Sequence, residues 1–100
     1  MRISQKQAET IQSICQTWLG DDLDLRVYGS RLDDSRRGGD IDLLVITPDP
    51  VSRLKRAQLT MALEDALGIA VDVLCHQAGT TPSPFASIAL NQAHPLRSVA

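Results

Sequence analysis

Two aspartates separated by one residue open an apolar segment of the chain. Asp40 and Asp42 flank Ile41 in the segment "DIDLLVIT", which continues with four apolar residues. In a β-strand, side chains two residues apart leave the same face, so these carboxylates would converge with their backbones about 7 Å apart. Burying a carboxylate without a partner is costly, so two of them in an apolar strand demand a reason.

A third acid has an equivalent setting. Asp72 stands between apolar residues in "IAVDVLCH", and it reaches the same point if the two strands are neighbours. Only a cation of high charge density offsets the repulsion of three carboxylates. Oxygen ligands with room for water favour Mg²⁺ or Mn²⁺ over zinc. Two such ions about 3.5–4 Å apart could activate an attacking hydroxyl and stabilise a leaving pyrophosphate.

Gly29 and Ser30 stand a short polar loop upstream of the acid pair. A glycine at a strand end lets a phosphate approach the backbone, and a serine that opens a helical turn presents its N–H and hydroxyl to an anion. The structural alternative is that Asp40 is an exposed residue at the start of the strand and that Asp72 pairs with an arginine, for which Arg26 is one candidate. The repeated pattern of acids among apolar residues favours the metal site.

Other chemistries lack support in the sequence. No P-loop or G-x-G-x-x-G motif occurs, and the segment "DDSRRG" does not continue as a calcium loop, because Leu44 stands where the bidentate Glu belongs. Cys15 and Cys75 lie far apart without metal-ligand spacing, so we expect small buried side chains rather than a disulfide or a zinc site. His76 and His94 are isolated.

Length and charge narrow the class of protein. The chain of 100 residues fits one domain, 1–100. A formal charge of -2 and a pI of about 5.5 give no basic field for nucleic acid or an anionic membrane. No apolar run reaches the length of a membrane span and no signal peptide is recognisable, so the expected compartment is the cytoplasm.

Hydrophobic periodicity predicts the elements that carry these residues. A capping box at Ser4 and Gln7 opens a helix that ends at Gly20. A strand in "LDLRVYG", the polar loop and the strand "DIDLLVIT" follow. A helix with Asp49 as its N-cap and Pro50 as its first residue runs to about residue 67, and its basic residues form a solvated face.

The remaining elements are the strand "IAVDVLCH" and a closing helix, in which Phe85, Ile88 and Ala89 point inward. Because a right-handed crossover helix joins the second and third strands, these two strands should be parallel neighbours. The fold class is therefore α+β, with a three-stranded mixed sheet flanked by helices in the order αβαβα.

Together the segments "RVYGS", "DIDLLV" and "AVDVL" resemble the nucleotidyltransferases of the DNA polymerase beta superfamily, in their minimal single-domain form. The resemblance covers nearly the whole chain. It implies a polymerase beta palm-like fold, and it gives Asp40, Asp42 and Asp72 the roles of metal ligands and catalytic residues for Mg²⁺ or Mn²⁺. Gly29 and Ser30 would hold the phosphates of the nucleotide.

Some positions in the loop leave alternatives open. Arg31 matches an arginine that often follows the Gly-Ser pair, and it would either contact phosphate or form a salt bridge within the loop. The loop is about one residue shorter than its commonest form, and Gly39 replaces a frequent serine. These departures affect nucleotide geometry more than metal binding.

The resemblance also implies an activity and partners. Minimal members transfer a nucleoside monophosphate from a nucleoside triphosphate, ATP in the first place, to a hydroxyl, and commonly serve as the antitoxin beside an all-helical HEPN-type partner. A second copy of the chain is a further candidate partner. The alternative function is a non-catalytic antitoxin that neutralises a helical partner by binding. A glycosyltransferase using Asp-x-Asp is disfavoured, since that class needs a much longer chain.

Overall fold

A computed structural model describes residues 3–28 and 41–96 of the chain. Asp42 and Asp72 are therefore the two predicted site residues whose environment is defined. Gly29, Ser30, Arg31 and Asp40 lie outside the described residues, so the roles given to them remain predictions.

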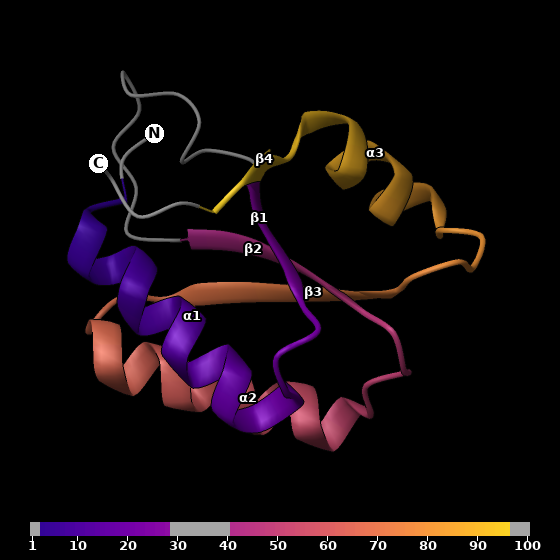
Figure 1. The fold of residues 1–100 in the computed structure, drawn as a ribbon. Helices are drawn as coiled ribbons and strands as arrows, with labels where there is room; N and C mark the ends of the chain where they lie inside the picture. Colours follow the sequence, from indigo (N-terminus) through magenta and orange to yellow (C-terminus); the bar gives the residue numbers. More distant parts are fainter. Residues whose placement is uncertain (1–2, 29–40, 97–100) are drawn as a thin grey trace.

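The described residues form helices and strands in the order αββαβαβ (Figure 1). The helices and the three strands expected from the sequence are all present. The expected order αβαβα counts only one of the two strands that precede α2, and the structure adds a short strand at the end. The elements are α1 (Gln5–Leu19), β1 (Asp24–Tyr28), β2 (Ile41–Thr47), α2 (Arg53–Leu67), β3 (Val71–Gln77), α3 (Pro84–Gln92) and β4 (His94–Pro95).

The sheet is mixed, as predicted, and its four strands lie in the order β3-β2-β1-β4. Strands β2 and β3 are parallel, which confirms the predicted crossover through α2, whereas β1 is antiparallel to both β2 and β4. The fourth strand was not predicted. It has two residues, and the backbone N–H of Leu96 continues its pairing by donating to the carbonyl of Leu25 at 2.8 Å.

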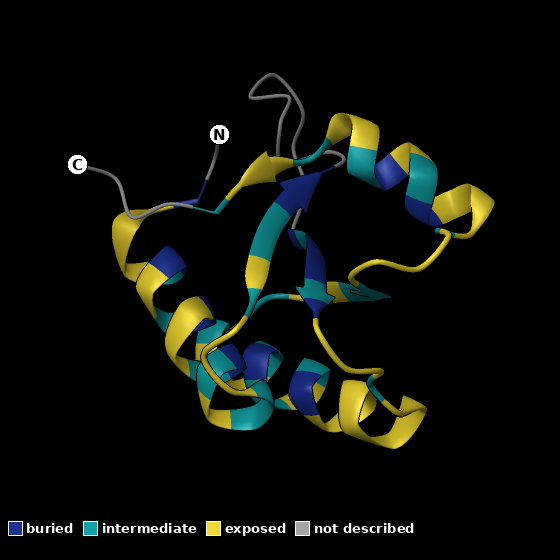
Figure 2. Cartoon of the chain, turned by 45° about the vertical axis from the view of Figure 1, so that its right-hand side comes forward, coloured by how far each residue is buried: buried dark blue, intermediate teal, exposed yellow. Residues whose placement is uncertain are grey.

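Helices cover the two faces of the sheet unequally. Helices α1 and α2 lie on one face and α3 lies on the other (Figure 1). The larger core fills the space between the sheet and helices α1 and α2, and buried residues of the strands and helices face each other across it (Figure 2). The central members of this core are Ile11, Cys15, Leu43, Val45, Leu59 and Leu63. A smaller cluster of Tyr28, Leu44 and Ala89 lies under α3.

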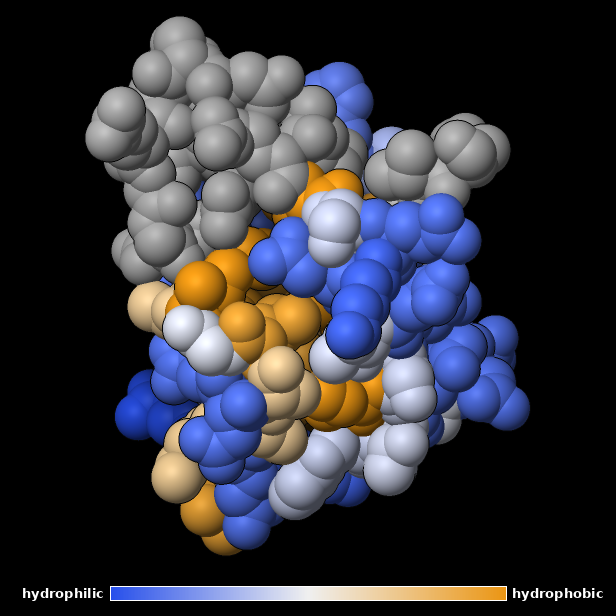
Figure 3. All heavy atoms as spheres, turned by 90° about the vertical axis from the view of Figure 1, so that its left-hand side faces the viewer, coloured by the Kyte–Doolittle hydropathy of each residue, from blue (hydrophilic) through white to orange (hydrophobic). Residues whose placement is uncertain are grey.

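The alternation of β2 produces this arrangement. Ile41, Leu43 and Val45 point into the larger core, while Asp42 and Leu44 point to the face of α3. Between Asp42 near its start and Thr47 at its end, β2 is thus apolar on both faces. Figure 3 shows the side of the molecule at the left of Figure 1, where hydrophobic residues are exposed as a strip among hydrophilic ones.

Side-chain caps define where the helices begin. The capping box of α1 is present: the Ser4 hydroxyl accepts from the N–H of Gln7 at 3.1 Å, and the Gln7 side chain accepts from the N–H of Ser4 at 3.0 Å. Helix α2 begins at Arg53, so the prediction of Asp49 as its N-cap is wrong. Ser52 caps the helix by accepting from the N–H of Lys55, and this bond starts the helix after the proline turn.

The orientation of α3 was only partly predicted. Ala89 is buried as expected, but Phe85 and Ile88 are 58% and 54% exposed. Ala86 and Ala89 face the sheet instead. These small side chains let the helix approach Tyr28 and Leu44 closely, and this leaves the larger apolar residues outside.

Both cysteines are free, as predicted. Cys15 is buried in the larger core, where burial raises the pKa of its thiol to about 12, so the thiol stays protonated and unreactive. Cys75 is half-buried rather than buried. Within residues 3–28 and 41–96, no helix is long and apolar enough to cross a membrane.

Two leucines of α2 test this description of the core. Leu63 is fully buried and Leu54 is 69% exposed. We expect Leu63→Ala to lower the free energy of unfolding by about 2–5 kcal/mol, because it leaves a cavity between α2 and the sheet. The matched Leu54→Ala should change it by less than about 0.5 kcal/mol. Urea denaturation followed by circular dichroism measures both, and equal losses would contradict the described packing.

Candidate functional site

Asp42 and Asp72 stand at the same level of two neighbouring strands. In the parallel pairing of β2 with β3, Asp42 is the register partner of Asp72. In the antiparallel pairing of β1 with β2, Tyr28 is the register partner of Asp42. Register partners on adjacent strands point to the same face, with the strands about 4.8 Å apart. The predicted convergence of Asp42 and Asp72 is therefore present.

Water reaches both carboxylates. Asp42, on the central strand, is half-buried, and Asp72, on the edge strand β3, is exposed. The two acids lie on the face covered by α3, because Leu44, two residues after Asp42, packs against Tyr28 and Ala89. This end of the face is open enough to admit a ligand while the rest of the strand remains covered.

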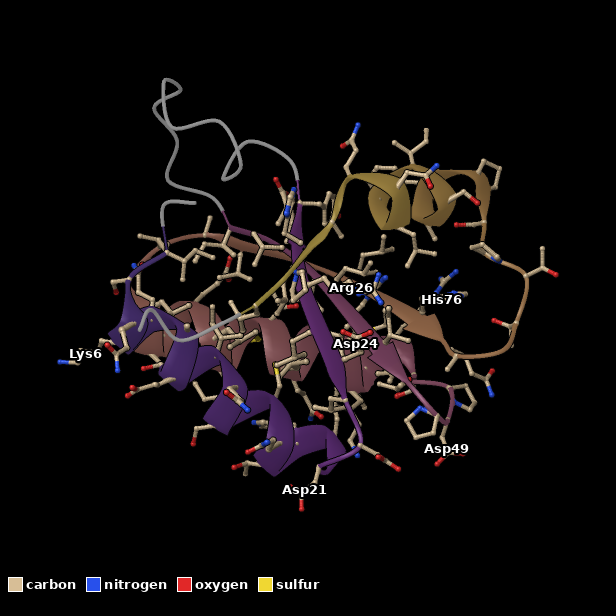
Figure 4. The ribbon with its side chains drawn as sticks, turned by 45° about the horizontal axis from the view of Figure 1, so that its top comes forward. Lys6, Asp21, Asp24, Arg26, Asp49 and His76 are labelled. Atoms are coloured by element: carbon tan, nitrogen blue, oxygen red, sulfur yellow. The ribbon has the colours of Figure 1, made fainter. Side chains whose placement is uncertain are left out.

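Arg26 does not form the structural pair with Asp72 that the sequence allowed. It pairs instead with Asp24 on its own strand: Nη2 donates to Oδ2 at 2.7 Å and Nε donates at 3.2 Å. The two side chains point toward each other in Figure 4. This hydrogen bond raises the pKa of the Arg26 guanidinium, although burial opposes the shift. The guanidinium of Arg26 is thus paired with Asp24 and is not the partner of Asp72.

A pocket of about 380 Å³ opens at the two carboxylates. It combines acidic, basic and aromatic side chains from strands and helices. The lining residues are Tyr28, Asp42, Arg56, Asp72, Val73, Leu74 and Phe85. Because successive residues of the edge strand β3 point to opposite faces, a pocket that includes Asp72, Val73 and Leu74 extends around the edge of the sheet.

The pocket at the other end of the sheet has a different character. It has a volume of about 290 Å³, and Trp18, Pro48, Asp49 and Lys55 are among its lining residues. It contains a single acid and no pair of carboxylates, so it offers no comparable site for a cation. The chemistry therefore points to the pocket beside Asp42 and Asp72.

The two acids affect the ionisation of Tyr28. The residue is 7% exposed, and the pKa of its phenol is raised, first by burial and then by the negative charges of Asp42 and Asp72. The ring meets Phe85 edge-on, with centroids 6.3 Å apart and planes at 75°. Tyr28 is thus a neutral hydrogen-bonding group at physiological pH, and it connects the carboxylates to the aromatic wall of the pocket.

Asp42 and Asp72 are the described residues that could contribute to a metal site. Asp42 and Asp72 present oxygen ligands in register, and these fit a hard divalent cation such as Mg²⁺ or Mn²⁺. Within the described parts of the chain, no three His, Cys, Asp or Glu side chains gather closely enough to hold a metal ion. A complete site therefore needs further ligands from Asp40, from water or from a substrate phosphate.

Three residues of the pocket were absent from the predicted site. Tyr28 directly precedes the Gly-Ser pair, and the strand register could have placed it beside Asp42. Arg56 was assigned to a solvated face with its basic neighbours, and Phe85 was assigned to the core. Sequence spacing gives no signal for either, because both reach the pocket from separate helices.

Comparison with known proteins gives a consistent result. A family profile described as "Nucleotidyltransferase domain" matches residues 8–95. No curated protein sequence matches the chain significantly.

Solved structures with a similar fold include two from toxin-antitoxin systems. One contains a tri-AMPylated HEPN toxin from Shewanella oneidensis in complex with its MNT antitoxin: 20% identity, TM-score 0.71, covering 95% of this chain and 72% of the other. A toxin-antitoxin structure with AMP-PNP is 19% identical, with TM-score 0.74 and coverage of 92% and 73%. A candidate minimal nucleotidyltransferase is 29% identical, with TM-score 0.67 and coverage of 95% and 98%.

Tyr28 is the single tyrosine of the chain, so its ionisation can be followed by tyrosinate absorbance. We expect a midpoint above the ordinary 10.0 in the wild type and a lower midpoint in Asp72→Asn and in Asp42→Asn, because each variant removes a nearby negative charge. The fold holds the neutral phenol, so folding stability present below pH 10 should be lost as the pH rises through the raised pKa.

Asp49→Asn is the control for this titration, because Asp49 lies in the turn after β2 and lines the other pocket. It should leave the midpoint unchanged. An unchanged midpoint in both Asp72→Asn and Asp42→Asn would contradict the described geometry.

Proposed function

This chain belongs to the family of nucleotidyltransferase domains, and we propose that it transfers a nucleoside monophosphate from a nucleoside triphosphate, ATP in the first place, to a hydroxyl of a partner protein or small molecule. The observation that carries the proposal is the register of Asp42 with Asp72 at an open pocket. The structural neighbours support the choice of nucleotide, since one contains AMP-PNP and another contains an AMPylated toxin.

The roles that we assign to the two acids follow from their different exposure to solvent. The acceptor hydroxyl oxygen attacks the α-phosphorus, a new P–O bond forms, and the bond to pyrophosphate breaks. Asp42, half-buried on the central strand, would hold Mg²⁺ or Mn²⁺ together with Asp40. When bound, the cation supplies positive charge that stabilises the phosphoryl oxygens and the leaving group.

Asp72 has the position for a different task. It is exposed on the edge strand, where an acceptor can approach from solvent. We assign it the role of third carboxylate, which assists the cation or takes the proton of the attacking hydroxyl. The phosphates would lie toward Gly29, Ser30 and Arg31, which follow Tyr28 in the sequence.

The acceptor is proposed to come from a second protein. A domain of this size leaves little wall for a deep acceptor pocket after its core is built. Structural neighbours from HEPN and MNT pairs support a partner of the HEPN type and the role of an antitoxin. We further propose that this partner is all-helical and that the pair acts in the cytoplasm. In this proposal the chain neutralises its partner by modifying it.

The test uses labelled ATP, Mg²⁺ and the co-expressed partner protein. We expect Asp42→Asn, Asp72→Asn and the double variant Asp40→Asn/Asp42→Asn each to lower label transfer by on the order of 100-fold or more, because each removes a carboxylate that acts on the reacting groups. Asp49→Asn should retain the activity of the wild type. Undiminished transfer by the double variant would contradict the assignment.

Neutralisation of the partner separates catalysis from simple binding. The double variant should still form the complex, as measured by co-purification, but it should no longer neutralise the partner. A double variant that binds and neutralises as well as the wild type would support the alternative of a non-catalytic antitoxin.

Arg56 gives a second prediction, about charge. It lines the pocket of the two carboxylates, whereas its neighbour Lys55 lines the pocket at the other end of the sheet. Because a polyanionic nucleotide is attracted to a cation in the pocket wall, Arg56→Ala should raise the KM for ATP by about 2- to 5-fold at low salt, and the difference should shrink as salt screens the charge. Lys55→Ala should leave the KM unchanged. Equal effects of the two variants would contradict this placement.

A further inference from the structure

We propose that Phe85 is the platform on which the base of the donor nucleotide stacks. The inference rests on the proposed nucleotidyl transfer and adds the subsite that recognises the nucleoside. It concerns a residue that sequence periodicity assigns to the core and that the fold places at the wall of the carboxylate pocket.

The position of Phe85 carries the inference. It is the second residue of α3 and lines the same pocket as Asp42 and Asp72. More than half of its surface is exposed. The edge-on contact with Tyr28 at 6.3 Å holds the ring beside the strand that bears the acids. An apolar ring is thus held in place at the mouth of the pocket without being buried.

Phe85 contributes little to the docking of α3. The helix contacts the sheet through Ala86 and Ala89, which are both buried. Ile88, on the same helix, is equally exposed but does not line the pocket. The two exposed apolar side chains therefore differ in that Phe85 lines the carboxylate pocket and contacts Tyr28, whereas Ile88 does not line the pocket.

A nucleobase suits this wall better than the other groups of a nucleotide do. The triphosphate is anionic and is drawn to cations and backbone N–H groups, whereas a base presents a flat π-face that stacks on an aromatic ring. The pocket volume of about 380 Å³ lies within the range of small-molecule sites. Stacking reads the π-face and not the hydrogen-bonding edge, so this contact by itself does not distinguish adenine from guanine.

The experiment compares two ligands that differ in the nucleoside. Isothermal titration calorimetry of the full chain with Mg²⁺ would measure AMP-PNP and inorganic tripolyphosphate in turn. Phe85→Ala should weaken AMP-PNP binding about tenfold and leave tripolyphosphate binding unchanged, because only the former carries a base. Phe85→Trp should retain or strengthen AMP-PNP binding. Ile88→Ala, the matched control, should bind both ligands as the wild type does.

Three results would overturn the proposal. If Phe85→Ala binds AMP-PNP as tightly as the wild type, the base does not stack on Phe85. If the variant loses affinity for both ligands equally, the substitution acts on the phosphate site or on the fold. If the wild type binds neither ligand, the proposed function fails along with the subsite. If the wild type binds both and Phe85→Ala has no selective effect, only the subsite fails.

Discussion

The parallel pairing of β2 with β3 is the constraint on which the proposed site depends, because it fixes two acids side by side. Parallel pairing of β2 with β3 sets Asp42 directly opposite Asp72, and no rearrangement of the side chains removes both acids from the same face. A stable sheet alone would require only apolar residues at these two positions. Leu44 and Leu74, the next register pair on the same face, are such residues.

The fold meets this constraint by giving the two faces of the sheet different tasks. One face is packed by α1 and α2 and contains the larger core. The other face is covered by the shorter helix α3, which docks through alanines and leaves the start of β2 and β3 accessible. Alternation along a single strand thus supplies both a buried anchor, Leu43, and the proposed metal ligand, Asp42. The crossover through α2 fixes the register that brings Asp72 beside it.

Local signals predicted most of this arrangement. The capping box at Ser4 depends on residues three apart, and the parallel pairing follows from the handedness of the crossover, so both were predictable and both are present. The convergence of Asp42 with Asp72 followed from the same topology.

The errors share a physical cause, which is that tertiary contacts override local patterns. Periodicity could not determine which side of α3 meets the sheet. Ala86 and Ala89 are buried against it, whereas the adjacent Phe85 stays exposed and meets Tyr28 only edge-on. Ser52, three residues after Asp49, caps α2 because its hydroxyl accepts from the N–H of Lys55. Arg56 reaches the pocket from another element, which no sequence spacing reveals. Of the predicted site, Gly29, Ser30, Arg31 and Asp40 remain predictions.

The most direct test of the central claim is the affinity for a divalent cation in the presence of AMP-PNP. Mn²⁺ binding, followed by electron paramagnetic resonance of the free ion, should weaken by at least about tenfold in Asp42→Asn and in Asp72→Asn, while Asp49→Asn should match the wild type. If both site variants bind Mn²⁺ as tightly as the wild type does, the paired carboxylates are not the cation site and the proposed role of Asp42 and Asp72 is wrong.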